Sequence, residues 1–235
     1  MTDYQLELID IVSHGADVKS FRFALKEDVF FRPGQYLVLT LPLEGRTVSK
    51  AFSISSSPTE KGFIQFTKKL SQSPFSMALE ALRRGESCHI RFPLGNFTFY
   101  GQFPRVAFLV GGIGITPVRS IFRYAADLNL ASSAILLYSS RSPEYLIFRE
   151  ELSAAQKANP NLKVIYTLTE CFQDVEGCRK GYIDEDMVKQ EIGDYAERVF
   201  YSCGPPAMVD AMRRMLNRKL SVPQDQIVTE DFVGY

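Results

Sequence analysis

Histidine and cysteine are scarce in this chain, which has two histidines and four cysteines among 235 residues. Cys171 and Cys178 are the only cysteines close together, and no second pair at metal-site spacing accompanies them. We therefore expect neither a zinc site nor an iron–sulfur cluster. Because the cysteines are scattered and no signal peptide is recognisable, we also expect no disulfide framework.

Net charge and long apolar runs are also lacking. Lys+Arg and Asp+Glu both total 27, so the formal net charge is zero and neither nucleic acid nor an anionic membrane is the expected main partner. No run approaches the roughly 18 apolar residues of a membrane span. The first residues alternate polar and apolar side chains without a cationic segment and an apolar block, so we expect a cytoplasmic protein.

The first hundred residues have the pattern of short strands and turns. Alternating polar and apolar residues occur at 4–12, 19–25, 34–42, 50–56 and 62–69, and glycine- or proline-containing turns separate most of these segments. A helical spacing of apolar residues occurs once, over 75–84. The pattern is typical of an all-β barrel or sandwich, and we expect an antiparallel, Greek-key-like β-barrel domain over residues 1–101.

The rest of the chain changes period. Apolar strands at 106–110, 134–140, 163–170 and 198–204 alternate with helical stretches at 117–127, 144–157, 184–193 and 205–218. This alternation is typical of a parallel sheet with helices on both faces. We expect a nucleotide-binding α/β domain over residues 102–235.

A glycine turn joins the first strand of this second half to a helix. Gly111, Gly112 and Gly114 precede Thr116 and Pro117, where the free N–H groups of a helix start can bind phosphate. Glycine permits close approach of a ligand and unusual backbone angles. The alternative is a purely structural turn, since the motif differs from the common dinucleotide fingerprint.

Two segments of the first half carry candidate ligand-binding residues. The strand from Lys50 to Ser56 combines a cation, an aromatic ring at Phe52 and several hydroxyls, which suits a planar aromatic ligand. A serine-rich strand end is the alternative. Ser73 and Pro74 fit an ordinary helix N-cap and first position, although the same helix start could receive a diphosphate.

Two segments of the second half carry further candidates. Cys203 ends a strand before Gly-Pro-Pro, at the sheet edge where ligands gather in α/β folds. A buried structural cysteine is the alternative. The chain closes on an acidic and aromatic segment containing Glu230, Phe232 and Tyr235, which could instead be a last strand that seals the core.

Taken in order, these motifs resemble the ferredoxin–NADP⁺ reductase-like superfamily of flavoenzymes over essentially the whole chain. The family's R-x-[YF]-S-x-x-S matches Lys50–Ser56 with lysine in place of arginine, and its G-G-x-G-[IV]-[TA]-P matches Gly111–Pro117. Its C-G-P-P matches Cys203–Pro206, and its E-x-[FY] matches Glu230–Phe232.

The resemblance implies a role for each matched residue. Ser53 would bond near the reactive N5 of FAD, Cys203 would lie beside the nicotinamide, and Glu230 would close the site. Phe52 and Phe232, with Tyr235 as a rival for the latter, would cover the two faces of the flavin ring. The full set of expected cofactor-binding residues is Lys50, Ala51, Phe52, Ser53, Ser56, Lys68, Ser73, Pro74, Phe75, Ser76, Phe232, Tyr235, Gly111, Gly112, Gly114, Thr116, Pro117, Arg141, Glu170, Gly204 and Pro205.

The identity of the coenzyme depends on residues after the strand at 163–170. Relatives specific for NADP⁺ often have Ser-Arg at this place, whereas this chain has Thr169-Glu170. An acidic side chain there repels a 2′-phosphate and suits a ribose diol, so we expect NADH to be preferred. Arg141 is the alternative, because it could provide a cation for the 2′-phosphate of NADPH.

The resemblance implies an NAD(P)H-dependent flavin oxidoreductase that passes electrons to a separate acceptor, such as a ferredoxin or an oxygenase component, since no C-x₄-C-x₂-C run is present. One alternative is an NAD(P)H:flavin reductase that uses free flavin as a substrate. A second alternative is a non-catalytic electron-transfer or regulatory subunit.

Lysine at position 50 generates a first prediction. Arginine binds a diphosphate with a bidentate fork, whereas lysine offers a point charge. We therefore expect Lys50→Arg to lower the dissociation constant for FAD in a fluorescence titration. An unchanged constant would contradict this assignment.

Overall fold

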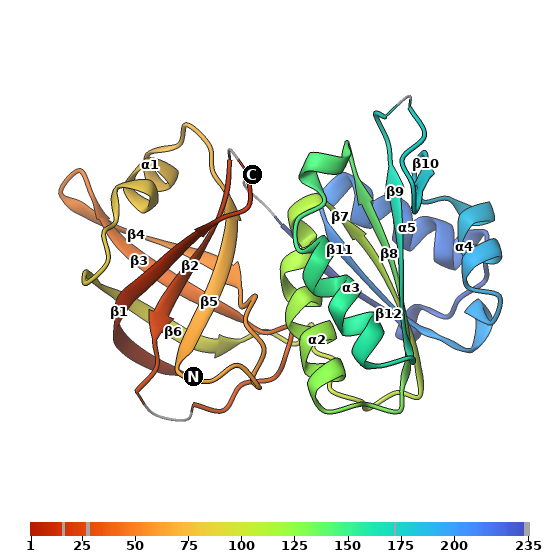
Figure 1. The fold of residues 1–235 in the computed structure, drawn as a ribbon, viewed down its shortest axis with the longest axis horizontal. Helices are drawn as coiled ribbons and strands as arrows, with labels where there is room; N and C mark the ends of the chain where they lie inside the picture. The colour runs from red at the N-terminus through yellow and green to blue at the C-terminus, as the bar shows by residue number, and fades with distance from the viewer. Residues whose placement is uncertain (16, 27–28, 172, 233–235) are drawn as a thin grey trace. The chain divides into compact units, whose positions relative to one another are not determined.

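The computed structural model describes residues 1–15, 17–26, 29–171 and 173–232. The chain divides into two compact units (Figure 1). Of the described residues, those within 1–100 and 116–124 belong to unit 1, and those within 101–115 and 125–232 belong to unit 2. None of the described helices is long and apolar enough to span a lipid bilayer.

Unit 1 is an antiparallel sheet in the strand order β4-β3-β6-β1-β2-β5. Its strands and helix are β1 (Thr2–Ser13), β2 (Val18–Ala24), β3 (Tyr36–Leu43), β4 (Arg46–Ser53), β5 (Phe63–Lys69), α1 (Pro74–Ala81) and β6 (Ser87–Leu94). An isolated antiparallel bridge between Ile54 and Phe66 joins the segment after β4 to β5. The two edge strands therefore meet, and the predicted β-barrel class is confirmed.

Aromatic and aliphatic side chains that alternate along the strands fill the interior of unit 1. Phe66 is fully buried, and its ring stacks on Phe52, Phe21 and Phe23 with centroid separations of 4.6, 5.2 and 6.1 Å. The expected strands did not include β6, whose Cys88, Ile90 and Phe92 point inward between β3 and β1.

Unit 2 is a parallel sheet in the order β10-β9-β8-β7-β11-β12. Its strands are β7 (Arg105–Gly111), β8 (Ser133–Ser140), β9 (Leu162–Leu168), β10 (Cys178–Lys180), β11 (Val199–Gly204) and β12 (Ile227–Asp231). The chain adds strands outward from β7 to β10 and then returns to the other side of β7 with β11. The strand order thus reverses between β7 and β11, which is where open α/β sheets bind ligands.

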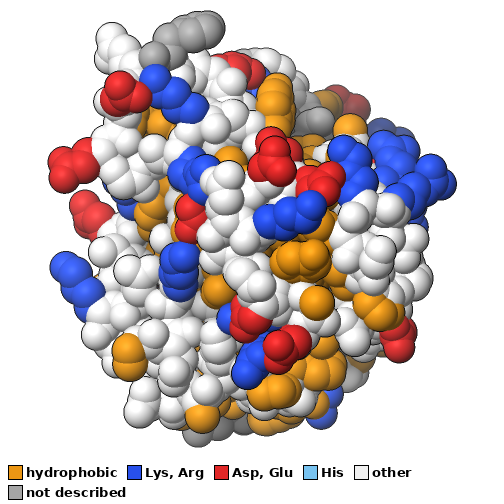
Figure 2. All heavy atoms as spheres, turned by 90° about the vertical axis from the view of Figure 1, so that its right-hand side faces the viewer, with side chains coloured by type: hydrophobic (Ala, Val, Ile, Leu, Met, Phe, Trp, Pro, Cys, Tyr) orange, Lys and Arg blue, Asp and Glu red, His pale blue; other side chains and the backbone are white. Residues whose placement is uncertain are grey.

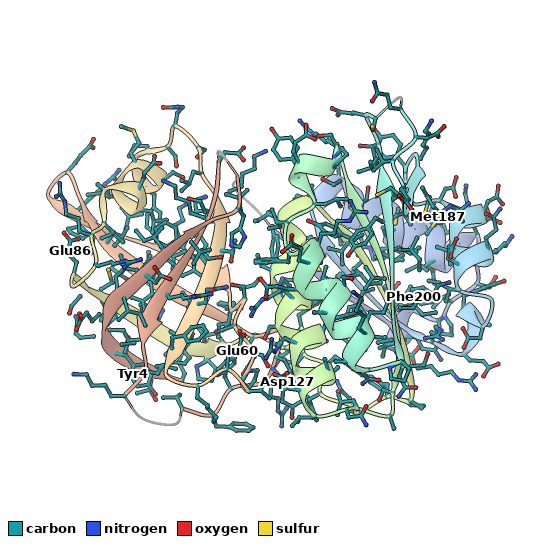
Figure 3. All side chains as sticks on the ribbon, viewed as in Figure 1. Tyr4, Glu60, Glu86, Asp127, Met187 and Phe200 are labelled. Atoms are coloured by element: carbon teal, nitrogen blue, oxygen red, sulfur yellow. The ribbon has the colours of Figure 1, made fainter. Side chains whose placement is uncertain are left out.

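The helices of the second half are α2 (Ile115–Asp127), α3 (Arg149–Ala158), α4 (Glu185–Glu191) and α5 (Pro206–Arg218). Residues 116–124 of α2 are part of unit 1. Apolar side chains of α4 and α5 pack with those of the sheet in one buried cluster, to which Met187 and Phe200 belong (Figure 3). The predicted α/β class is confirmed, whereas α3 begins at Arg149 and not at 144 because Phe148 has a left-handed backbone conformation.

Charged side chains of both signs are interspersed over the face drawn in Figure 2, with one group of basic side chains at its edge. This mixture agrees with a formal net charge of zero. Among the described residues, no group of three or more His, Cys, Asp or Glu side chains is arranged to hold a metal ion.

The stacked position of Phe66 generates a prediction about stability. Truncation of a fully buried ring removes apolar contacts and leaves a cavity, so we expect Phe66→Ala to lower the free energy of unfolding by about 3–5 kcal/mol. Urea denaturation followed by circular dichroism measures this loss. The matched control is Phe30→Ala, because Phe30 is 80% exposed; equal losses from both variants would contradict the assigned core.

Candidate functional site

The strand that carries the flavin-type motif ends in a buried run of residues. Lys50 and Ala51 are exposed on β4, whereas Phe52 and Ser53 are buried opposite Leu37 and Tyr36 of β3. The ring of Phe52 packs on Phe66 and lies 5.9 Å from the ring of Phe75. Phe52 is therefore part of the core of unit 1, and its expected stacking on a flavin stays a prediction.

Two lysines converge near this strand. The Nζ atom of Lys68, a residue that is only 7% exposed, lies 5.9 Å from the centre of the Phe52 ring. Burial lowers the pKa of Lys68, and the positive charge of Lys50 lowers it further. Like charges that are close together and partly desolvated fit a bound anion such as a diphosphate, which would offset both effects.

The start of α1 follows Lys68 by a few residues. Ser73 is the N-cap of α1 and accepts a hydrogen bond from the Ser76 amide, and Pro74 occupies the first turn, so the predicted capping is confirmed. The hydroxyls of Ser71 and Ser76 are 3.1 Å apart, and sequence reasoning missed Ser71. No acidic residue lies in the first turn of α1, which leaves the positive end of the helix dipole uncompensated.

The presence or absence of an acidic residue in the first turn also divides the helices of the second half into two groups. Neither α2 nor α5 has an acidic residue in its first turn. By contrast, α3 has Glu150 and Glu151 there, and α4 has Glu185 and Asp186. The helices that start at the glycine turn and at the Cys-Gly-Pro-Pro turn are thus the ones whose N-termini can accept an anion.

The glycine turn and the Cys-Gly-Pro-Pro turn contact each other at the end of unit 2 where the strand order reverses. Cys203 is fully buried, and its thiol donates a hydrogen bond to the Gly114 carbonyl oxygen at 3.0 Å. Burial raises the pKa of Cys203 well above its ordinary value, and the charge of Glu230 acts in the same direction. The thiol is therefore protonated and serves as a donor.

Close packing in this contact assigns different roles to the glycines. A methyl group on Gly114 would lie 2.5 Å from the Cys203 carbonyl oxygen and 2.7 Å from the Gly204 Cα. A methyl group on Gly111 would overlap the sulfur of Met208. Gly112 has φ +52°, and a methyl group on it would have no neighbouring atom within 4 Å, so its open face is available to a ligand.

Strand β12 brings the acidic and aromatic residues of the last motif to the same carboxyl end of the sheet. Glu230 of β12 pairs with Cys203 of β11, and the Phe232 amide donates to the Gly204 carbonyl oxygen at 3.2 Å. Unit 2 thus brings together Cys203, Gly204, Glu230 and Phe232, whose roles toward a nicotinamide and a flavin stay predictions. Tyr235 lies outside the described residues.

Arg141 and Glu170 follow the neighbouring strands β8 and β9. The Arg141 Nε atom is 3.6 Å from Glu170 Oε1, and both side chains are largely exposed. The Glu170 amide donates to the Arg141 carbonyl oxygen at 2.9 Å. Glu170 therefore places a carboxylate beside the Arg141 guanidinium at the carboxyl end of the sheet.

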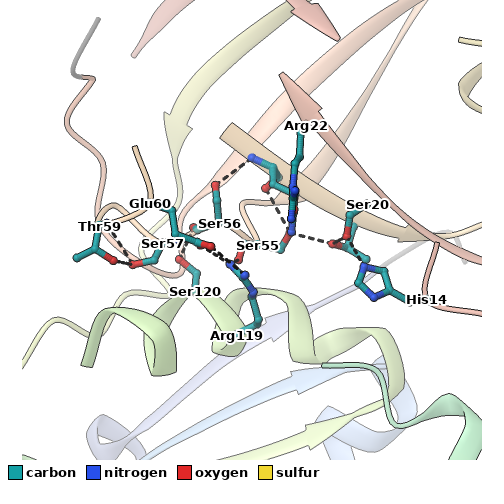
Figure 4. Close-up of polar contacts among 12 residues, drawn as sticks. His14, Ser20, Arg22, Ser55, Ser56, Ser57, Thr59, Glu60, Arg119 and Ser120 are labelled. Atoms are coloured by element: carbon teal, nitrogen blue, oxygen red, sulfur yellow. Dashed lines mark hydrogen bonds and ion pairs between the residues drawn. The ribbon is translucent and has the colours of Figure 1, made fainter. Parts of the chain in front are cut away.

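A chain of polar side chains inside unit 1 was not predicted (Figure 4). The Ser55 hydroxyl contacts Thr67 Oγ1 at 2.8 Å and accepts from Gln65 Nε2 at 3.0 Å. Thr67 contacts Ser20, which in turn contacts His14, each at 2.7 Å. Gln65 and Thr67 lie at alternate positions of β5, on the face opposite Ile64 and Phe66, and both are buried. The ordinary alternation of polar and apolar residues therefore gave no signal that these polar side chains would be buried.

The two classes of glycine generate a prediction. Gly114→Ala forces backbone atoms apart, so we expect a lower melting temperature for unit 2. Gly112→Ala costs only about 1–2 kcal/mol for its left-handed conformation, but its methyl group occupies the open face. We expect the latter variant to stay folded and to bind ADP-ribose more weakly in calorimetry. Unchanged ADP-ribose affinity in Gly112→Ala would contradict the assignment.

Comparison with known families supports both halves of the site. Residues 5–99 match the oxidoreductase FAD-binding domain model, and residues 108–214 match the oxidoreductase NAD-binding domain model. The glycine betaine monooxygenase reductase subunit of Pseudomonas aeruginosa is 31% identical over 216 residues, which are 88% of this chain and 58% of that protein. The chain thus spans less than two thirds of the length of this relative.

Solved structures share the fold. The cytochrome b5 reductase domain of Ulva prolifera nitrate reductase has a TM-score of 0.86 at 21% identity, covering 97% of each chain. The ferredoxin reductase in carbazole 1,9a-dioxygenase has a TM-score of 0.81 at 26% identity, covering 98% of this chain and 69% of that chain.

The two family models together match most of the chain in the order that the motifs predict. Lysines and an acid-free helix start in unit 1 fit the diphosphate of FAD, and the open glycine turn in unit 2 fits that of a nicotinamide dinucleotide. The chain therefore belongs to the oxidoreductases in which an FAD-binding domain is followed by an NAD-binding domain, and it has the fold of the ferredoxin–NADP⁺ reductase-like flavoproteins.

Proposed function

We propose that the chain transfers a hydride from NADH to FAD and passes the electrons to a separate acceptor protein, such as a ferredoxin or an oxygenase component. The observation that carries this proposal is the glycine turn at the strand-order reversal of unit 2, with Gly112 open to a ligand. The names of two similar proteins, reductases of a monooxygenase and a dioxygenase, support the choice of acceptor.

The residues of unit 1 hold FAD, which supplies the two-electron acceptor for the hydride. Lys50, Lys68 and the start of α1 bind the diphosphate. Ser53 donates a hydrogen bond near N5 of the ring. The task of these groups is to orient the flavin, because hydride transfer is mainly a problem of positioning. They do not have to carry a proton over a long distance.

The residues of unit 2 hold the coenzyme. The N–H groups of the glycine turn, up to Ile115 at the start of α2, bind its diphosphate beside Gly112. Cys203 stays a protonated, fully buried thiol, so it shapes the nicotinamide pocket and does not act as a nucleophile. Glu230 lies half-buried on the neighbouring strand and closes the pocket on that side.

The ion pair between Arg141 and Glu170 supports NADH over NADPH. Both side chains follow the carboxyl ends of their strands, where the adenosine ribose binds in this class of fold. A carboxylate at that position accepts hydrogen bonds from a ribose diol and repels a 2′-phosphate. A higher kcat/KM for NADPH than for NADH would contradict this preference.

The absorbance spectrum and extracted cofactor of the purified protein test the main proposal. We expect a yellow protein that keeps its FAD on desalting and that oxidises NADH when an artificial electron acceptor is added. A colourless protein that reduces added FMN or FAD would favour a reductase that uses free flavin as a substrate. A protein that oxidises no NADH with any acceptor would favour a non-catalytic subunit.

Removal of the charge at position 170 generates a prediction about specificity. Glu170→Gln leaves Arg141 available to a 2′-phosphate, so we expect kcat/KM for NADPH to rise relative to NADH by roughly threefold to tenfold, as befits an exposed pair. Asp225→Asn is the matched control, because Asp225 is exposed and precedes β12 at the amino end of the sheet. An equal ratio in all three proteins would contradict the role of Glu170.

A further inference from the structure

Unit 1 contains a buried ion pair between Arg119 and Glu60, neither of which has been given a role above (Figure 4). Arg119 of α2 is 4% exposed, and the Glu60 side chain is 15% exposed. Arg119 Nη2 donates to Glu60 Oε1 at 3.0 Å, and its Nη1 donates to Glu60 Oε2. The guanidinium therefore binds the carboxylate through both of its terminal nitrogens, which is the strongest geometry for such a pair.

Both partners also bind the backbone at the carboxyl end of the flavin motif. Arg119 Nη1 donates to the Ser55 carbonyl oxygen at 2.8 Å, and Glu60 Oε2 accepts from the Ser57 amide at 2.7 Å. The next residue of the helix contributes as well, because the Ser120 hydroxyl donates to the Ser56 carbonyl oxygen at 2.7 Å. Three consecutive residues are thus held by α2 and Glu60.

The opposite side of the same segment is held by β5. The amides of Ser55 and Ser56 both donate to the Gln65 carbonyl oxygen, at 2.7 and 3.3 Å. The Ser56 hydroxyl in turn accepts from the Gln65 amide at 2.9 Å. Since the amides face β5 and the carbonyls face α2, the orientation of these peptide planes is determined from two directions.

The segment held in this way, Ser55–Ser57, contains the last two residues of the flavin motif. Ladder pairing with β3 fixes β4 as far as Ser53, opposite Tyr36. Beyond Ser53, the backbone is held by the hydrogen bond that the Ile54 amide donates to the Gln35 carbonyl oxygen and by the contacts described above for the segment Ser55–Ser57. The carboxyl end of the motif is therefore set by Arg119 and its carboxylate partner.

Stability alone gives no reason for a charged pair here. A buried ion pair contributes about as much to stability as an apolar pair of similar volume, because desolvation offsets the Coulomb attraction. An apolar pair, however, could not bind the Ser55 carbonyl or the Ser57 amide. The geometry favours a role in orientation of the segment.

We propose that Arg119, paired with Glu60, is a positioning residue for FAD, which fixes the backbone of Ser55–Ser57 and thereby the placement of Ser53 against the flavin ring. The inference rests on the proposed function, in which unit 1 binds FAD. Arg119 itself touches the motif's backbone, and its effect on the flavin passes through the serines.

Four variants of the full chain separate positioning from stability. They are Arg119→Met, Glu60→Gln, Arg119→Lys and the double variant Arg119→Met/Glu60→Met. The matched control is Arg198→Met in unit 2, because Arg198 is also 4% exposed, pairs with Asp194 and donates to the Val106 carbonyl oxygen. The measurements are the melting temperature, the dissociation constant for FAD, the visible absorption spectrum of the bound flavin and its midpoint potential.

We expect Arg119→Met to lower the melting temperature, since it leaves a buried carboxylate without its partner. The double variant should recover most of that loss. Arg119→Met and the double variant should both bind FAD about tenfold more weakly, which is equivalent to the loss of about one hydrogen bond to a charged group. Both should also show a shifted absorption spectrum and midpoint potential of the bound flavin. Arg119→Lys should lie between them and the parent, and Arg198→Met should lower stability with an unchanged flavin.

Three results would overturn the proposal. The first is an unaltered spectrum, potential and FAD affinity in the double variant. The second is a loss of FAD affinity that follows melting temperature in every protein, Arg198→Met included. The third is a parent chain that takes up no FAD, which would overturn the proposed function together with this inference. If the parent binds FAD, the first or second result would overturn this inference alone. If Arg119→Met does not fold, the lysine and double variants decide the outcome.

Discussion

A contact between two backbone turns determines the arrangement of the nucleotide-binding unit. The turn after β7 and the turn after β11 approach so closely that Gly114 has no room for a side chain beside Cys203. The buried thiol bonds to the Gly114 carbonyl oxygen across this contact, and β12 places Glu230 on the other side of Cys203. Because three glycines are used to pack these turns, Gly112 alone of the motif's glycines keeps a face with no neighbouring atom.

The flavin-binding unit uses a different means to fix the end of a strand. Its motif contains serines where the other unit has glycines, and side chains from β5 and α2 hold the serine backbone through hydrogen bonds and one buried ion pair. Glycine contacts allow a close approach to a flexible diphosphate. Charged and hydroxyl contacts orient a backbone that, in the proposed function, presents the Ser53 hydroxyl to the flavin ring.

The sequence was sufficient to predict both sheet types, the strands that carry the motifs and the N-cap at Ser73, because alternation and capping are local properties. It did not reveal strand β6 between its two turns, although Cys88, Ile90 and Phe92 alternate there. Nor did it reveal the pair of Arg119 with Glu60, whose members are 59 residues apart. Long-range polar contacts depend on how strands are ordered in space, which alternation does not specify. The roles of Ser53, Phe52 and Phe232 toward the flavin stay predictions.

The central claim is that NADH bound at the glycine turn reduces FAD bound at the serine motif by direct hydride transfer. Anaerobic rapid mixing of the FAD-loaded protein with NADH tests this claim most directly, with a parallel experiment that uses NADH deuterated at the transferred position of C4. We expect rapid loss of the oxidised flavin's visible absorbance, and a slower loss with the deuterated coenzyme. Flavin absorbance that persists in excess NADH would contradict it.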